Sequence, residues 1–324
     1  MTQAIGTKAI ERSKRVFRIL LVSILSVLIG SGFTLDYTNQ ALAKQAEQAP
    51  IASATETSSI ATVTEPEPTP TTPATPDPVL AAIQARQTAS GCNLHVDPAV
   101  AVMSLGTCKL LLVGDSLGNN LGYGMIPQLK GYKSLKFVLK AKASTGLSNS
   151  WFYNWETNLK SYLRTEKPNI VVVFLGANDR QNMKVGGQIL TFGTSKWKTA
   201  YAASVARMTK MATDSGAYLL WVGLPNCKPY NYNKGMELIS AIYAKTVPQN
   251  HGARYIELHN FTSDARGNYT QYQTVNGSRL KTRGDDGIHF TANGQNVIGT
   301  YAITKLATLF KVAIKSNYPR VVTK

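Results

Sequence analysis

One stretch decides the fold: Leu110-Leu111-Leu112-Val113-Gly114-Asp115-Ser116-Leu117. Its first four residues are apolar and predict a buried strand, and the residues from Gly118 onward predict a turn into a helix. A serine at a strand-to-helix turn lies at the carboxyl edge of a sheet, where its hydroxyl can face a substrate. Ser116 is therefore a candidate nucleophile, and the alternative is that it only caps the following helix.

Downstream of this stretch, short apolar runs alternate with longer amphipathic ones. This alternation predicts an α/β fold in which a five-stranded parallel sheet carries helices on both faces. Functional sites in such sheets lie outside the carboxyl ends of the strands. The expected strands are 110–113, 136–139, 170–175, 218–222 and 254–258, and the expected helices are 151–164, 196–213, 234–246 and 292–315.

Polar and glycine-rich loops follow these strands and hold the other candidate site residues. Gly146 lies in the loop after the second strand, and Asn178 lies in the loop after the third. Asp286 and His289 lie in the loop before the last helix. We expect all four to gather with Ser116 at one edge of the sheet.

The four blocks resemble, in this order, the SGNH/GDSL hydrolase superfamily, which is named for Ser, Gly, Asn and His. The resemblance covers about residues 108–315 and implies a three-layer, flavodoxin-like fold. Two further segments, Gly176-Ala-Asn-Asp-Arg-Gln181 and Trp221-Val-Gly-Leu-Pro225, look like a bacterial exported branch. That branch resembles the catalytic domains of peptidoglycan O-acetyltransferases and O-acetylesterases.

Acyl transfer gives each of these residues a role. Ser116 would attack an ester carbonyl, and His289 would take its proton and return it to the leaving alcohol. Asp286, three residues before His289, would hold the imidazole in the right tautomer. The main-chain N–H groups of Ser116 and Gly146 and the side-chain amide of Asn178 would form the oxyanion hole.

Each role has a structural alternative. His289 could be a core histidine, Asn178 could stabilise a turn, and Gly146 could be a turn glycine. We expect Asp115 and Asp179 to stabilise loops. We also expect His251 and His259 to have structural roles. Arg180 would either contact an anionic substrate or be solvated.

The net charge of +17 is unevenly distributed. The first 90 residues hold seven charges of each sign, so the excess belongs entirely to residues 91–324. A basic surface concentrates polyanions, such as nucleic acid, an anionic envelope polymer or a membrane surface. The alternative is a soluble surface that is rich in lysine without a binding role. Export of the chain argues against nucleic acid and favours the envelope polymer.

Export is predicted from the N-terminus. Five basic residues precede the uncharged apolar run 19–35, and Ala41-Leu42-Ala43 fits a signal-peptidase site. Residues 1–43 would therefore be a cleaved signal peptide or an uncleaved membrane anchor. Residues 44–90, with half of the 14 prolines, would form a disordered tether, and 91–324 would form the hydrolase domain.

The three cysteines are Cys92, Cys108 and Cys227. In an exported protein a disulfide is permitted, but the spacing does not decide the pairing. A Cys92–Cys108 bond would staple the entry to the domain and leave Cys227 free. With no C-x-x-C motif and no Cys/His cluster, we expect neither a metal nor another cofactor.

The sequence as a whole predicts an exported serine esterase that removes O-acetyl or other short acyl groups from cell-envelope carbohydrate. One alternative is an O-acetyltransferase, which would need a separate membrane protein as acyl donor. A lipase or thioesterase is a further enzymatic alternative, although residues 182–195 hold few large apolar side chains. An inactive hydrolase-fold binding module is the alternative from another class.

Overall fold

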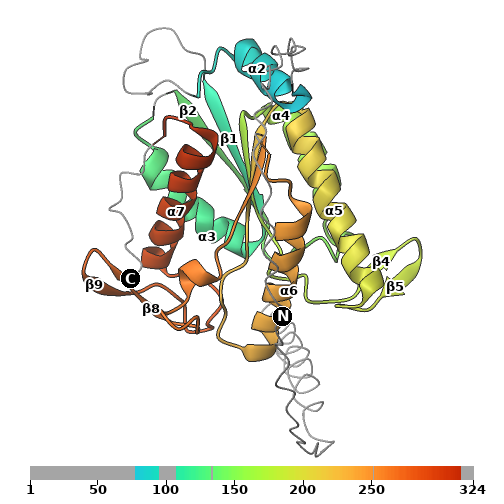
Figure 1. Cartoon of the computed structure of the whole chain (residues 1–324), viewed down its shortest axis with the longest axis vertical. Coiled ribbons are helices and arrows are strands. Elements are labelled where there is room, and N and C mark those ends of the chain that lie inside the picture. The colour runs from blue at the N-terminus through green and yellow to red at the C-terminus, as the bar shows by residue number, and fades with distance from the viewer. Residues whose placement is uncertain (1–76, 95–106, 133, 251, 315–324) are drawn as a thin grey trace, which may run out of the picture. The chain divides into compact units, whose positions relative to one another are not determined.

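The computed structural model describes residues 77–94, 107–132, 134–250 and 252–314 (Figure 1). The chain divides into two compact units, 1–69 and 70–324, and every described residue belongs to the second. The predicted signal or anchor segment, most of the predicted tether and His251 lie outside the described residues. Within the described ranges, no helix is long and apolar enough to cross a membrane.

A five-stranded parallel sheet forms the centre of this unit and has the order β2-β1-β3-β6-β7. In chain order this is 2-1-3-4-5, the flavodoxin-like arrangement, in which the strand order reverses between β1 and β3. The predicted α/β fold class is therefore confirmed. The strands are β1 (Cys108–Gly114), β2 (Leu135–Ala141), β3 (Ile170–Phe174), β6 (Tyr218–Val222) and β7 (Ala253–Ile256).

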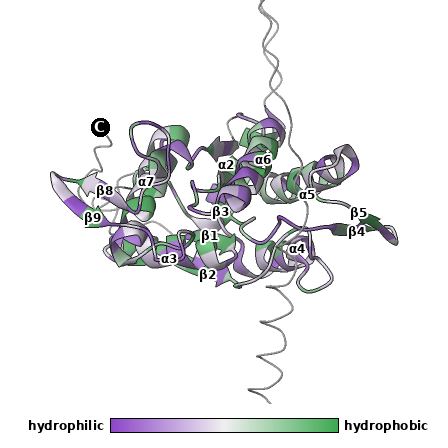
Figure 2. Ribbon diagram, turned by 90° about the horizontal axis from the view of Figure 1, so that it is seen from below, coloured by the Kyte–Doolittle hydropathy of each residue, from purple (hydrophilic) through white to green (hydrophobic). Residues whose placement is uncertain are grey.

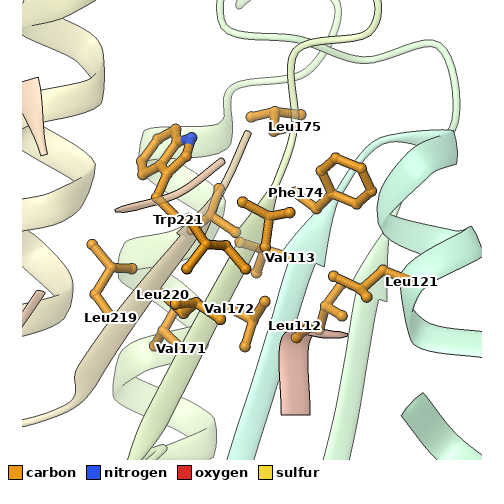
Figure 3. Packing of buried hydrophobic residues seen from close by; sticks show 14 of the residues in the cluster. Leu112, Val113, Leu121, Val171, Val172, Phe174, Leu175, Leu219, Leu220 and Trp221 are labelled. Carbon is orange, nitrogen blue, oxygen red and sulfur yellow. The ribbon is translucent and has the colours of Figure 1, made fainter. Parts of the chain in front are cut away.

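The core lies on both faces of the three central strands. Leu112 of β1 pairs with Val172 of β3, which pairs in turn with Leu220 of β6, and all three side chains are fully buried (Figure 3). Each such side chain contributes roughly 1.5–3 kcal/mol of transfer free energy. Burial on both faces also explains why these strands are unbroken apolar runs in the sequence.

Helices cover both faces of the sheet, as predicted (Figure 1). On one face α3 and α7 approach closely, and a Cβ at Gly124 would lie 1.8 Å from the carbonyl oxygen of Gln295. The other face carries α4, α5 and α6. The bounds are α3 (Ser116–Leu129), α4 (Trp155–Glu166), α5 (Ser195–Asp214), α6 (Tyr230–Thr246) and α7 (Ala292–Phe310).

Some helix bounds differ from the predicted ones. Helix α4, expected to begin at residue 151, begins at Trp155, because the Asn154 side chain caps it by accepting a hydrogen bond from the N–H of Thr157. Helix α6, expected to begin at residue 234, begins at Tyr230, directly after Pro229. The last helix ends at Phe310, where Lys311 adopts a left-handed conformation.

Two short hairpins were not predicted. They are β4 (Met183–Val185) with β5 (Gln188–Leu190), and β8 (Tyr272–Val275) with β9 (Ser278–Lys281). Both turn residues have positive φ in each case, at Gly186-Gly187 and at Asn276-Gly277, as in type I′ hairpins. Arms of three or four residues are too short to show a periodic pattern. The hairpins lie at opposite ends of the unit, beyond the helix layers (Figure 2).

The predicted tether is wrong at its C-terminal end, where residues 78–90 form helix α2 (Pro78–Ser90). Pro78 occupies the first turn, and the Asp77 side chain caps the helix by accepting from the N–H of Val79. Ile83 is buried, and a Cβ at Gly216 would lie 2.5 Å from the carbonyl oxygen of Ala82. The helix therefore packs on the domain, which begins at residue 77 rather than 91 within the described ranges.

A disulfide joins Cys92, just after α2, to Cys108 at the start of β1, while Cys227 is free and buried. Of the three possible pairings, which the spacing left open, the structure has the one that staples the domain entry. A short 3-10 helix, η1 (Asn260–Thr262), follows β7 and completes the set of described elements.

Candidate active site

Ser116, His289 and Asp286 form a continuous hydrogen-bonded chain at the carboxyl edge of the sheet. The Ser116 Oγ atom lies 2.9 Å from His289 Nε2, and His289 Nδ1 lies 2.6 Å from Asp286 Oδ2. The side chains of His289 and Asp286 are 42% and 46% exposed, so solvent and substrate can reach them. The structure thus brings together the three residues predicted for catalysis.

Asp286 uses its two oxygens for different purposes. Oδ1 accepts from the main-chain N–H groups of Ile288 and His289, at 2.8 and 3.0 Å, while Oδ2 faces the imidazole. Partial burial raises the pKa of this carboxyl, but the hydrogen bonds from His289 and Ile288 outweigh it, so the net pKa is below its usual value. An ionised Asp286 accepts a hydrogen bond from a protonated Nδ1 of His289. The unprotonated Nε2 can then accept a hydrogen bond from the Ser116 hydroxyl.

Arg283, which was not predicted as a site residue, holds this loop in place. Its fully buried guanidinium donates from Nη2 to the carbonyl of Ile288 at 2.7 Å and to that of Gly287 at 3.3 Å. From Nη1 it donates to the carbonyl of Asn226, in the loop after β6. Arg283 therefore ties the His289 loop to a neighbouring strand end. A lone arginine gives no such signal in the sequence.

Asp115 ties the turn of the serine to the loop after β3. Its buried carboxyl accepts from the N–H of Leu117 at 2.8 Å and from those of Gly176 and Ala177 at 2.9 and 2.8 Å. Complete burial raises the pKa of Asp115 to about 6, although the three hydrogen bonds oppose this rise. The structure places Asp115 as a loop-stabilising residue, as predicted.

Asp179, in the loop after β3, ties that loop to the one that contains Gly146. It accepts from the N–H groups of Leu147 and Ser148, from the Ser148 hydroxyl and from the Tyr201 hydroxyl at 2.7 Å. Burial raises the pKa of Asp179, and these hydrogen bonds lower it only in part. A Cβ on Gly146 would lie 2.1 Å from Asp179 Oδ1, so the close approach of the loop requires glycine here.

The three groups predicted for the oxyanion hole lie on these tied loops. Asn178 Nδ2 donates to the carbonyl of Thr145 at 2.9 Å, and its second N–H is left for another acceptor. Ser116 is the first residue of α3, where N–H groups lack helical partners. Within the described ranges, the main-chain N–H groups of Ser116 and Gly146 donate to no protein acceptor. Their catalytic role stays a prediction.

The remaining candidates lie outside this hydrogen-bonded group. Arg180 is exposed and lies along α6, with its Cδ atom close to Gly235. His259 Nε2 lies 3.5 Å from Glu237 Oε1, and its structural role stays a prediction. The Cys227 thiol is buried 3.7 Å from Arg283 Nη2, and burial raises its pKa, which disfavours the reactive thiolate.

Several solved structures of similar fold are named as hydrolases or esterases. A structure named TesA is 23% identical, with a TM-score of 0.40, over 62% of this chain and 99% of that one. A GDSL-like lipase from Bacteroides thetaiotaomicron is 12% identical, with a TM-score of 0.42, over 72% and 98%. The esterase EstA from Pseudoalteromonas sp. is 16% identical, with a TM-score of 0.42, over 63% and 98%.

No curated protein matches the chain in a sequence search. The resemblance to SGNH/GDSL hydrolases is confirmed in the sheet order and in the four blocks that meet at one edge, while the peptidoglycan O-acetyl branch stays a prediction. A family profile matches residues 109–305, which is more than half of the chain and includes all four blocks. The chain therefore belongs to the family described as protein of unknown function (DUF459).

Proposed function

We propose that this protein is an exported serine esterase that removes O-acetyl or other short acyl groups from cell-envelope carbohydrate. The observation that carries the proposal is the hydrogen-bonded chain from Ser116 Oγ through His289 to Asp286 Oδ2. A serine hydroxyl is a poor nucleophile near neutral pH unless a base removes its proton. His289 Nε2 lies within reach of that proton.

The first half-reaction forms an acyl-enzyme. Ser116 Oγ bonds to the ester carbonyl carbon while its proton moves to His289 Nε2. The tetrahedral intermediate collapses with cleavage of the ester C–O bond, and the imidazolium returns the proton to the departing sugar hydroxyl. In the second half-reaction, water attacks the acyl-serine with His289 as base, which releases the carboxylic acid and restores the hydroxyl of Ser116.

Preorganised donors would stabilise the oxyanion in both half-reactions. The N–H groups of Ser116 and Gly146 and the free N–H of Asn178 belong to loops that Asp115 and Asp179 hold together. Each such donor contributes on the order of 3 kcal/mol in the transition state. Because the loops are fixed by buried hydrogen bonds, the donors need not reorganise during the reaction.

The envelope as the place of action is supported by the sequence alone. The basic N-terminal flank, the apolar run 19–35 and the excess of Lys and Arg after residue 90 fit an exported protein that acts on an anionic polymer. Its partner would be an acylated glycan rather than nucleic acid. N-terminal association with the membrane is part of the same proposal.

Transfer of the acyl group to a sugar hydroxyl would use the same acyl-enzyme and differs only in the acceptor. A membrane acyl-donor protein would then be required, and product analysis separates the two outcomes. An inactive binding module would not need an intact nucleophile, base and carboxylate in hydrogen-bonding order, so their presence favours an enzyme.

The test is hydrolysis of p-nitrophenyl acetate by the purified full chain. We expect turnover that falls by roughly 10⁴-fold or more in Ser116→Ala. The matched control is Ser278→Ala, an exposed serine on β9, which should keep wild-type activity. Turnover that survives in Ser116→Ala, or no turnover in the wild type, contradicts the proposal.

A further inference from the structure

The loop between β2 and α4 exposes two large aromatic side chains beside the candidate site. Trp151 is 79% exposed and Phe152 is 50% exposed, and their rings meet edge to face at 6.1 Å. Exposed clusters of this kind mark binding surfaces more often than isolated surface residues do. The same loop contains Gly146, five residues before Trp151.

The loop holds these rings out in a fixed arrangement. The carbonyl of Asn149 accepts from the N–H groups of Phe152 and Tyr153, at 2.9 and 3.3 Å. Trp155 Nε1 donates to the Thr145 hydroxyl at 3.0 Å, which ties the end of the loop to its beginning. The display of Trp151 is therefore built into the fold and is not the result of a loose segment.

A positive charge lies next to these rings. The Nζ atom of Lys142, which is exposed, lies 5.9 Å from the centre of the Phe152 ring and 5.0 Å from that of Tyr153. Such cation–π contacts hold an ammonium group in place without neutralising it. Residues 142–155 contain no Asp or Glu, so no acidic side chain within the loop offsets this charge.

We propose that Trp151, Phe152 and Lys142 form a glycan subsite that selects acylated polysaccharides with acidic sugar units. The open face of the Trp151 ring would stack on the apolar face of a sugar ring, and Lys142 would pair with its carboxylate. Trp151 lies within about 18 Å of Gly146, the greatest span of five extended residues, so the sugar unit in the subsite would be a neighbour of the acyl-bearing unit. This inference rests on the proposed esterase function and adds the substrate class to it.

The experiment compares a small ester with two polymers. The full chain and its Trp151→Ala, Phe152→Ala and Lys142→Ala variants are assayed with p-nitrophenyl acetate, with chemically acetylated polygalacturonate and with chemically acetylated dextran. The matched control is Tyr123→Ala, which removes a 55% exposed aromatic ring from α3. A second measurement, affinity electrophoresis in gels with unacetylated polygalacturonate, reports binding without turnover.

We expect Trp151→Ala to raise KM for both polymers about tenfold or more, with kcat/KM for p-nitrophenyl acetate changed by less than about twofold. Phe152→Ala should act in the same direction, and Lys142→Ala should raise KM for the acidic polymer only. Retardation by polygalacturonate should weaken in Trp151→Ala and Lys142→Ala, and Tyr123→Ala should match the wild type throughout.

Failure of the subsite and failure of the esterase function give different results. Unchanged polymer KM and retardation in Trp151→Ala, or absence of retardation in the wild type, would overturn the subsite. An equal loss on the small ester would also overturn it, since the loop would then act on the reaction itself. No turnover of p-nitrophenyl acetate by the wild type would instead contradict the esterase function.

Discussion

At the scale of single residues, three carboxylates near the serine divide the work between positioning and proton transfer. Asp115 and Asp179 are buried and accept main-chain N–H groups from neighbouring loops. Asp286 is half-exposed and faces the imidazole of His289. Only Asp286 therefore acts on the base directly, and the two buried carboxylates act through the loops that they hold.

The contribution of Asp286 can be measured with Asp286→Asn. An amide at this position presents an N–H or a neutral oxygen to Nδ1, so it favours the wrong tautomer of His289 and no longer stabilises the imidazolium. We expect kcat for p-nitrophenyl acetate to fall by about 10²–10⁴-fold with little change in KM. Asp285→Asn, the adjacent exposed residue paired with Lys281, is the control and should keep wild-type kcat.

Substitution of Gly146 tests how closely the loop after β2 must approach Asp179. In Gly146→Ala the new methyl group would collide with Asp179 Oδ1, so the loop must move and take the Gly146 N–H with it. We expect kcat to fall by roughly 10²–10³-fold, the usual cost of one lost oxyanion donor. Ser150→Ala, an exposed substitution in the same loop, serves as control. A Gly146→Ala variant with wild-type kcat would remove this glycine from the candidate site.

The catalytic candidates could be predicted because their chemistry is local. Ser116 follows an unmistakable strand, and Asp286 and His289 lie three residues apart on one polar loop. Arg283 could not be predicted, because its partners are carbonyl groups of Asn226 and Ile288, and main-chain acceptors carry no sequence signature. The exposed aromatic pair at Trp151 and Phe152 was not predicted, because a helix was expected to begin at residue 151, whereas the helix begins at Trp155.

At the scale of elements, the central strands were predictable and the additions around them were not. β1, β3 and β6 are buried on both faces and so are continuous apolar runs. The two hairpins depend on turn residues with positive φ rather than on periodicity. Helix α2 lies next to a proline-rich stretch whose composition favours disorder, and its packing against Gly216 and Gly252 depends on residues far away in the sequence.

The disulfide at the end of α2 gives a prediction for this element. Cys92 and Cys108 close a loop of 16 residues, so replacing both by serine should lower the free energy of unfolding by about 3 kcal/mol. The loss would appear as a lower midpoint in urea unfolding. Activity of the folded fraction should be unchanged, because the bond lies at the end of β1 opposite Ser116. Reductant should lower the midpoint of the wild type and leave that of the double variant unchanged.

At the scale of the whole molecule, the buried carboxyl of Asp115 links stability to pH. Its pKa is about 6 in the folded protein, against an ordinary value of 3.8. Between these values the folded state binds more protons than the unfolded state, so the free energy of unfolding falls as pH rises from 4 toward 7. The loss attributable to this group is on the order of 3 kcal/mol.

Comparison with Asp115→Asn isolates the pH-dependent contribution of Asp115 to the free energy of unfolding. The amide cannot ionise, but its single oxygen replaces two acceptors for three N–H groups, so the variant should be less stable than the wild type at pH 4. The difference in free energy of unfolding between the two proteins should shrink by up to about 3 kcal/mol at pH 7. Urea unfolding at both pH values measures it, and a difference that grows with pH would contradict the assignment.

Helix α2 also gives the folded unit a built-in direction. It packs beside Gly216 and Gly252, which lie just before the starts of β6 and β7, whereas Ser116 follows the opposite end of β1. Helix α2 therefore lies toward the end of the sheet opposite the turn that carries Ser116 (Figure 1). Coupling the folded unit to a bead or sensor chip through the first turn of α2 would therefore leave Ser116 facing the solution, so such a preparation should present its reactive end uniformly to large polymers.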